Sequence, residues 1–410
     1  MSPRDIPEGD PPPAATLSPP ARLKPSMLLL VAMTGIGPFT MQILIPSLPA
    51  LAEALSSSYG TAQLTLTLYL AGVAVAQLIY GPLSDRYGRK PLLLGGLVLY
   101  CLGSLGAALA PSIHGLILAR VVQAVGGCAG LVLGRAMIRD AYPREEAASR
   151  LGIVSTAMAV APMIAPLLGS LLETEFGWRA PMLACLVFGL PLLAAIRLRL
   201  PETLAEPAPL PGLAGMLGAY ASLLRLPAFR AYCGITAFAT GMFFAFAGGA
   251  PLVVIKGLGY SSTAYAVAMM TTPFAWSSGT FIAARLTGRV GMARMMALGT
   301  GVMVTGGLLA VLLPLLVPGH IALMFLPMAV SAFGNGMTQP NAIACAISVR
   351  PNLAGTASGF IGAAQMGCGA LMTVLCGMTE TGWGLATGFW MLVSALATLW
   401  ALLASRRLKA

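Results

Sequence analysis

The chain has 410 residues, of which 57% are hydrophobic and only 9% are charged. A soluble domain carries roughly 25% charged residues, because its solvent-facing side has to be polar. The composition therefore excludes an ordinary soluble protein and predicts an all-α integral membrane protein. The net charge of +11 is then better explained by membrane topology than by nucleic-acid binding.

The chain begins with 26 polar, proline-rich residues, for which we expect a disordered cytoplasmic tail. The apolar run from Met27 to Pro46 is longer than the core of a signal peptide, which has roughly 7–15 residues. We therefore interpret it as the first membrane span. Each predicted span is close to the roughly 20 residues that cross a bilayer. The twelve predicted spans are 27–49, 62–83, 91–110, 114–137, 150–172, 178–199, 229–250, 262–284, 293–315, 319–341, 352–376 and 382–404.

The basic residues predict the orientation of these spans. With the N-terminus inside, nearly all of the 24 Lys and Arg fall in cytoplasmic segments. Only Arg179 and Lys256 fall on the other side, and Arg120 lies within a span. Because basic residues concentrate in cytoplasmic loops, both termini are predicted to be cytoplasmic.

A proline-rich polar connection at 200–228 divides the predicted spans into two sets of six. We expect an N-terminal half at 27–199, a cytoplasmic linker, a C-terminal half at 229–404 and a short cytoplasmic tail at 405–410. Arg86 and Gly88 recur as Arg289 and Gly291 at the corresponding place in the second half. This weak repeat is typical of transporters built from two related halves.

The loop after the second predicted span reads Gly81-Pro82-Leu83-Ser84-Asp85-Arg86-Tyr87-Gly88-Arg89-Lys90-Pro91. It resembles the signature loop of the major facilitator superfamily, which braces the cytoplasmic closure between two six-helix halves. The resemblance implies gating roles for Gly81, Asp85, Arg86, Gly88 and Arg89. From the residues themselves, we expect Gly81 to allow close packing and Asp85 to cap the next helix. An ordinary turn that holds positive charge inside would also fit.

Two further motifs resemble those of antiporters in this superfamily. Arg120-Val121-Val122-Gln123-Ala124-Val125-Gly126 is similar to the conserved arginine motif, and residues 161–169 are similar to the motif with paired prolines, here Pro162 and Pro166. These prolines lie one turn apart, so we expect them to bend the fifth span and to take part in gating. Alanine stands at 161 and 165, where the motif usually has glycine.

Three short stretches look like the Bcr/CflA group of drug:proton antiporters. They are Ile45-Pro46-Ser47-Leu48-Pro49, Pro201-Glu202-Thr203 and Pro340-Asn341-Ala342. The resemblance implies a monomeric transporter in the bacterial inner membrane that exports small drug-like molecules, such as amphenicols, in exchange for protons. It implies no cofactor and no bound metal.

Arg120 is the most informative single residue, because an arginine inside a membrane helix is costly unless it faces a cavity or has partners. It could attract an anionic group or influence a proton site, and the alternative is that it snorkels to the surface. Gly126, Gly130 and Gly134 follow on the same helix and predict a smooth face for close packing.

Polar side chains scattered among the apolar spans form a candidate cavity lining. Any of them could instead make an ordinary hydrogen bond between helices. The candidate lining residues are Gln42, Tyr69, Gln77, Arg120, Gln123, Asn335, Gln339, Asn341 and Gln365.

Gln42 departs from the Bcr/CflA pattern, which has an acidic residue at this position of the first span. None of the 13 Asp and Glu lies deep in a predicted span. Protons would then couple elsewhere, for example at Asp85 or Asp140, or transport would be exchange or downhill flow. Such a cavity favours neutral or anionic substrates, because Arg120 repels cations.

Other function classes have less support. The chain lacks a phosphate-binding G-x-x-x-x-G-K-[ST] loop and the H-E-x-x-H and G-x-S-x-G motifs, which argues against an ATP-driven pump and against an enzyme. A channel is allowed by hydropathy, but two halves favour alternating access. The remaining alternatives are an exporter or importer of a specific metabolite and a sensor or scaffold without transport.

Overall fold

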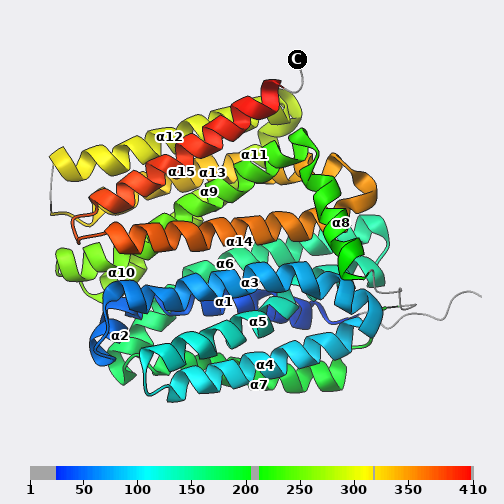
Figure 1. The fold of residues 1–410 in the computed structure, drawn as a ribbon, viewed down its shortest axis with the longest axis horizontal. Coiled ribbons are helices and arrows are strands. Elements are labelled where there is room, and N and C mark those ends of the chain that lie inside the picture. Colours follow the sequence, from blue (N-terminus) through cyan, green and yellow to red (C-terminus); the bar gives the residue numbers. More distant parts are fainter. Residues whose placement is uncertain (1–24, 205–211, 317–318, 408–410) are drawn as a thin grey trace, which may run out of the picture.

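A computed structural model describes residues 25–204, 212–316 and 319–407, and among these it contains helices and no strands (Figure 1). The first half holds α1 (Met27–Ile43), η1 (Ile45–Ser47), α2 (Leu48–Ala54), α3 (Tyr59–Tyr87), α4 (Arg89–Leu109), α5 (Ile113–Ala141), α6 (Arg144–Phe176) and α7 (Ala180–Arg199). The connecting helix is α8 (Leu213–Leu224).

The second half follows the same plan. It holds α9 (Pro227–Pro251), η2 (Leu252–Gly257), α10 (Ser262–Met269), α11 (Thr271–Val290), α12 (Met292–Leu316), α13 (Ala322–Ser348), η3 (Pro351–Leu353), α14 (Ala354–Thr379) and α15 (Leu385–Arg407). A helix satisfies its backbone hydrogen bonds within one segment, which is why apolar spans of this length fold as helices.

Nine helical segments of the described residues are long and apolar enough to cross a membrane. The other three predicted spans are 150–172, which lies within α6, 262–284, which falls on α10 and α11, and 319–341, which overlaps α13 from Ala322 onward. The twelve predicted spans are therefore consistent with the structure. Their bounds differ by a few residues, and the last helix runs to Arg407 rather than ending at residue 404.

The buried apolar side chains form separate cores in the two halves. One cluster is built almost wholly from α1 to α7, and the others are built mainly from α9 to α15. Between the halves, the long helices α3 and α14 pack against each other, and α6 contacts α10 and α11. This two-part packing is the arrangement that the sequence predicts.

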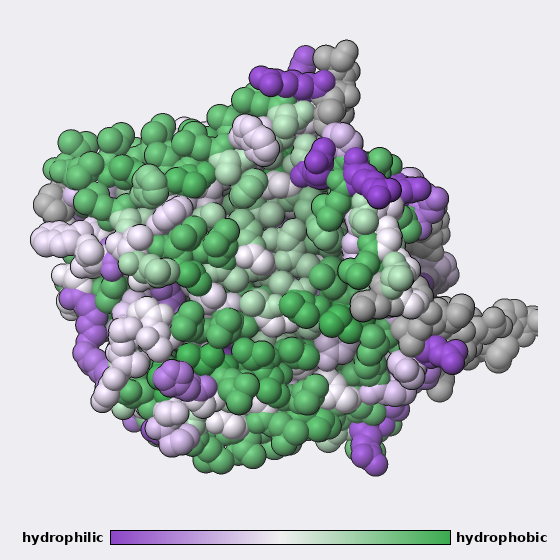
Figure 2. Space-filling model, viewed as in Figure 1, coloured by the Kyte–Doolittle hydropathy of each residue, from purple (hydrophilic) through white to green (hydrophobic). Residues whose placement is uncertain are grey.

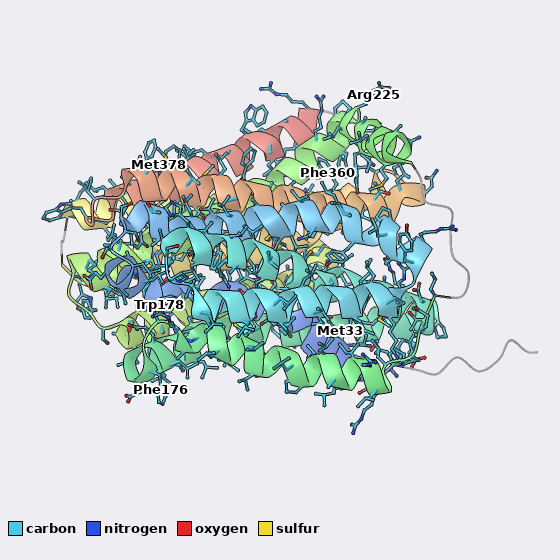
Figure 3. All side chains as sticks on the ribbon, turned by 60° about the horizontal axis from the view of Figure 1, so that its bottom comes forward. Met33, Phe176, Trp178, Arg225, Phe360 and Met378 are labelled. Carbon is cyan, nitrogen blue, oxygen red and sulfur yellow. The ribbon has the colours of Figure 1, made fainter. Side chains whose placement is uncertain are left out.

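We call the end at which α3 and α15 finish, with Tyr87 and Arg407, the termini-bearing end, and the end with α2 and α10 the opposite end (Figure 1). Figure 3 shows Arg225 at the former and Phe176 and Trp178 at the latter. In Figure 2, hydrophobic residues cover much of the middle of the visible face, and hydrophilic residues gather toward the ends. This distribution suits a protein that spans a bilayer.

The predicted linker at 200–228 contains more regular structure than the sequence analysis expected. Its residues 213–224 form α8, which runs across the ends of the long helices (Figure 1). The Tyr220 hydroxyl donates to the Leu78 carbonyl of α3 at 3.0 Å. Burial raises the pKa of this phenol, so it stays protonated and able to donate. The predicted disordered tail at 1–26 lies outside the described residues, except for Pro25 and Ser26.

Candidate functional site

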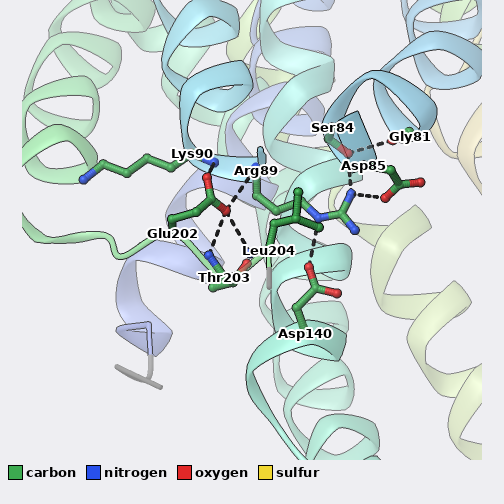
Figure 4. Close-up of polar contacts among 9 residues, drawn as sticks. All are labelled: Gly81, Ser84, Asp85, Arg89, Lys90, Asp140, Glu202, Thr203 and Leu204. Atoms are coloured by element: carbon green, nitrogen blue, oxygen red, sulfur yellow. Dashed lines mark hydrogen bonds and ion pairs between the residues drawn. The ribbon is translucent and has the colours of Figure 1, made fainter. Parts of the chain in front are cut away.

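Arg89 is the centre of a charge cluster at the termini-bearing end (Figure 4). Its side chain is nearly buried at the start of α4, and its Nε lies 2.9 Å from Asp140 Oδ2 at the end of α5. Its Nη1 lies 2.6 Å from Asp85 Oδ1 and 2.5 Å from Ser84 Oγ, both on the last turn of α3. One guanidinium thus joins the ends of three helices of the first half.

Glu202 caps α4 from the residues that follow α7. Its carboxylate accepts hydrogen bonds from the backbone N–H groups of Arg89 at 3.1 Å and Lys90 at 3.0 Å (Figure 4). It also accepts from Thr203 N–H at 2.8 Å and Leu204 N–H at 2.9 Å. A carboxylate at a helix N-terminus satisfies N–H groups that have no partner inside the helix. The Pro201-Glu202-Thr203 stretch is recognisable in the sequence, but nothing near it indicates that Glu202 caps α4.

Two predictions about the signature loop are wrong. Asp85 does not cap the next helix, because its carboxylate pairs with Arg89 and Glu202 occupies the capping position. Gly81 is not needed for close packing, since a Cβ added there meets nothing within 4 Å. Gly88 is the glycine that the fold requires, because its φ of +96° is strained for any side chain and Glu202 lies 2.7 Å from an added Cβ.

The other predicted gating residues occupy different surroundings. Arg86 is exposed, and no ion pair is found for it within the described part of the chain. Pro162 and Pro166 lie inside the continuous helix α6. One turn later, Gly169 lies so close to the Ile43 carbonyl that a Cβ there would overlap with it. The gating roles of these residues stay predictions.

Arg120 lies fully buried in the first half, which excludes the snorkelling alternative. Its Nη1 donates to Gln123 Oε1 at 2.6 Å and to the Thr40 carbonyl of α1 at 3.2 Å. Its guanidinium carbon lies 4.3 Å from the centre of the Tyr69 ring, in cation–π contact. Gln123 in turn donates to Ser104 on α4 at 2.7 Å. The structure therefore brings Arg120, Gln123 and Tyr69 together, as the candidate set predicts, but in an enclosed cluster.

Among the described residues, two nitrogens of this buried arginine, Nε and Nη2, have no hydrogen-bond partner. Gln42 is also buried on α1, and within the same part of the chain its Oε1 has no partner either. The described carboxylates all lie at helix ends or in loops. The interior of the first half thus holds an uncompensated positive charge with free donors, which would stabilise an acceptor or an anionic group.

The predicted glycine face on α5 is confirmed, and it holds Arg120 in place. A Cβ on Gly126 would overlap with the backbone of Tyr100 on α4. A Cβ on Gly130 or Gly134 would overlap with Met33 or Thr34 on α1. These contacts require the absence of a side chain, so α1 and α4 approach α5 closely enough to contact the polar cluster.

The second half contributes a separate, uncharged polar group. On α13, Asn335 Nδ2 donates to the Ala239 carbonyl at 3.3 Å, and Gln339 Nε2 donates to Thr240 Oγ1 at 2.8 Å. Both partners lie on α9. Asn341 is different, because it donates to the Met337 carbonyl of its own helix at 3.0 Å. Gln365 is half-buried on α14.

Gln77 lies between the halves rather than among either polar group. It is buried on α3, and a Cβ on Gly362 of α14 would overlap with its amide. Gln63 makes the equivalent approach to Gly377 near the other end of the same helix pair. Gln63 is not among the predicted lining residues, although it is a buried amide on the same helix as Gln77.

Cross-half contacts at the opposite end were also missed. Lys256 of η2 forms an ion pair with Glu53 of α2. The Tyr59 hydroxyl donates to the Gly248 carbonyl at 2.7 Å, and the Ser262 hydroxyl donates to Glu173 Oε2 at 2.8 Å. We call these three contacts the opposite-end latch. Their partners are far apart in sequence, so no local pattern could have paired them.

Metal binding and disulfides find no support in the described residues. No group of three or more His, Cys, Asp or Glu in this part of the chain could hold a metal ion. No disulfide joins any of the seven cysteines, all of which lie in the part of the chain that the structure describes.

The sequence pattern of the Major Facilitator Superfamily matches residues 30–373. The chain is 32% identical over 340 residues to a chloramphenicol resistance protein of Pseudomonas aeruginosa, covering 80% of this chain and 76% of that protein. It is 30% identical over 359 residues to multidrug resistance protein D of Escherichia coli, covering 87% and 90%. It is 28% identical over 353 residues to a bicyclomycin resistance protein homolog of Haemophilus influenzae, covering 84% and 87%.

Solved structures share the fold at low sequence identity. A D-xylose–proton symporter superposes with a TM-score of 0.71 at 16% identity, covering 91% of this chain and 96% of that one. A bacterial Spinster homolog in an inward-facing, unoccupied conformation gives a TM-score of 0.71 at 17% identity, covering 93% and 96%.

Proposed function

The chain belongs to the major facilitator superfamily, and we propose that it exports small drug-like molecules across the bacterial inner membrane by alternating access. The relatives that are named for resistance to chloramphenicol, to bicyclomycin or to several drugs support this reading. They also confirm the predicted resemblance to the drug:proton antiporters. We propose that the working unit is a monomer with both termini in the cytoplasm, as the distribution of basic residues predicts.

The unpaired positive charge of Arg120 is the observation that carries the substrate class. It is fully buried beside Thr40 and Gln123, and the described spans hold no carboxylate to neutralise it. A permanent positive charge at low dielectric repels organic cations and favours neutral molecules with acceptor groups, or anions. Amphenicols are neutral and carry such acceptors, so they are the first substrates to test.

Proton coupling then needs a carboxylate outside the first span, because Gln42 cannot take up and release a proton. The described candidates are Asp85 and Asp140 at the termini-bearing end and Glu53 and Glu173 at the opposite end. Glu53 and Glu173 contact the second half, whereas Asp85 and Asp140 lie within the first half, at its termini-bearing end. We propose that protonation at these ends, rather than inside the first half, drives the cycle.

The test measures uptake of labelled chloramphenicol into inside-out vesicles, with and without a protonophore. Wild-type protein is compared with Gln42→Asp, which places an acid on α1 two residues after Thr40, whose carbonyl accepts from Arg120. It is also compared with Gln365→Glu, which places an acid on α14 of the second half. We expect protonophore-sensitive uptake by the wild type. Gln42→Asp should shift the pH dependence of uptake relative to the wild type and should admit a cationic dye, because the new carboxylate compensates Arg120. Gln365→Glu should change neither property.

Two results would contradict the proposal. If wild-type vesicles accumulate no chloramphenicol, amphenicol export is wrong and a specific metabolite becomes the better substrate. If Gln365→Glu admits the cation as well as Gln42→Asp does, the charge near Arg120 does not select the substrate.

A further inference from the structure

A groove of about 700 Å³ lies between the start of α9 and the end of α15, at the termini-bearing end of the second half. The two helices pack side by side there (Figure 1). The walls of the groove are apolar, and Trp400 and Leu403 are 69% and 46% exposed. The residues that line it are Pro227, Arg230, Ala231, Gly234, Phe238, Trp400, Ala401, Leu403, Ala404 and Arg407.

Arg230 and Arg407 place two positive charges at the rim of this groove. Both are exposed, neither has an ion-pair partner among the described residues, and no Asp or Glu lines the groove. The N-terminal end of α9 adds a partial positive charge at the same place. The rim is therefore suited to an anion with acceptor oxygens.

A second groove of the same half provides a contrast. It has a volume of about 490 Å³, lies at the opposite end and is lined by Val253, His320, Met324 and Trp383 among others. None of its lining residues is Lys or Arg. Of these two grooves in the described part of the chain, the one at the termini-bearing end combines apolar walls with a pair of arginines.

We propose that the groove between α9 and α15 binds one anionic glycerophospholipid from the bilayer. Its phosphate lies between Arg230 and Arg407, and one acyl chain follows the walls past Gly234 to Phe238. Helix rise places Phe238 about 12 Å along the axis from Arg230, so the groove runs from the rim toward the hydrocarbon. Gly234 leaves room for the chain, because its position carries no side chain.

The chemistry favours an anionic headgroup over a zwitterionic one. Arginine binds phosphate through paired N–H donors, and basic pockets between membrane helices recognise anionic lipid headgroups. An ammonium headgroup would need a carboxylate, which the lining lacks. This site is separate from the Arg120 cluster, so the inference does not depend on the transported substrate.

The experiment is native mass spectrometry of the full chain in detergent, titrated with phosphatidylglycerol or phosphatidylethanolamine. We expect the wild type to retain one phosphatidylglycerol in preference to phosphatidylethanolamine. Arg230→Gln and Arg407→Gln should each weaken binding about fivefold, because each removes one charge contact with the headgroup. Gly234→Leu should displace the chain while both arginines remain. Arg406→Gln is the matched control, because Arg406 is an exposed neighbour that does not line the groove.

Two outcomes would overturn the proposal. Equal weakening by Arg406→Gln would show that the lipid responds only to general surface charge. Equal retention of phosphatidylethanolamine and phosphatidylglycerol by the wild type would show that the groove does not select an anionic headgroup. The apparent melting temperature of each variant in lipid-free detergent separates loss of binding from loss of folding.

Discussion

The two ends of the molecule are held in different ways. At the termini-bearing end, Arg89 joins Asp85 and Asp140, and all three belong to the first half. At the opposite end, the latch joins the halves, with Lys256 on Glu53 and Tyr59 on Gly248. The first arrangement makes one half rigid, whereas the second ties two halves together.

This difference indicates which contacts must break during alternating access. A rocking motion of one half against the other leaves the Arg89 cluster intact, because its helices move together. The same motion toward the other state must separate the opposite-end latch and slide α3 along α14. The observed structure is therefore the state in which the opposite end is closed.

Removing the centre of the rigid cluster should have the largest effect. Arg89→Ala leaves Asp85 and Asp140 without their shared cation, and we expect a loss of about 2–3 kcal/mol in the free energy of unfolding. Transport should be lost with it. The measurement is the apparent melting temperature in detergent together with chloramphenicol flux. Arg86→Ala is the control for the melting temperature, since Arg86 lies three residues away at the end of α3 but is exposed. If Arg89→Ala and Arg86→Ala have the same melting temperature, the Arg89 cluster does not stabilise the first half.

The sequence predicted the features that depend on local pattern. Apolar length gave the spans, and the spacing of Gly126, Gly130 and Gly134 gave the close packing of α5, because both properties repeat along one helix. The resemblance indicated a role for Arg89. Asp85 was the residue predicted to cap the helix that begins at Arg89, whereas the structure has Glu202 in that position. Asp85 is adjacent in sequence, whereas Glu202 reaches α4 only after the first half has folded.

The contacts at the opposite end could not be predicted from the sequence, because they too form only after distant segments have folded together. Glu53 and Lys256 belong to different halves, and nothing in either neighbourhood specifies the other. The sequence predicted that Arg120 has polar neighbours, because a buried arginine requires them. The sequence could not tell that these neighbours enclose Arg120 completely.

Bulkier residues on α14 should push the two halves apart at one end of the molecule at a time. A Cβ on Gly377 overlaps with Gln63 near the opposite end, and a Cβ on Gly362 overlaps with Gln77 nearer the termini-bearing end. Each Gly→Ala change should cost about 1–2 kcal/mol, because only a flexible amide must move. Hydrogen–deuterium exchange should rise in α2 and α10 for Gly377→Ala and in α8 for Gly362→Ala. Identical exchange maps for the two variants would mean that the α3–α14 contacts do not control the two ends separately.

A single latch hydrogen bond should have a smaller effect. Tyr59→Phe removes the donor to the Gly248 carbonyl and weakens the closed opposite end by about 1 kcal/mol. The population of the state that is open at this end should then rise about fivefold. Accessibility of a cysteine introduced at Thr263, the half-buried neighbour of Ser262 in α10, to a membrane-impermeant thiol reagent measures this rise. Tyr260→Phe serves as the control, because the Tyr260 hydroxyl has no hydrogen bond to any residue that the structure describes.

The smallest effect is expected for the charged contact of the latch. The side chains of Lys256 and Glu53 are 41% and 68% exposed, so solvent and salt screen their attraction. Glu53→Gln should therefore destabilise the closed opposite end by no more than about 0.5 kcal/mol at low salt, measured by the thiol accessibility, and not at all at 1 M salt. Glu175→Gln, an exposed carboxylate at the same end, should give no shift at either salt concentration. A shift for Glu53→Gln that persists at high salt would mean that the pair is shielded from solvent, and the opposite-end latch would then depend on charge rather than on the Tyr59 hydrogen bond.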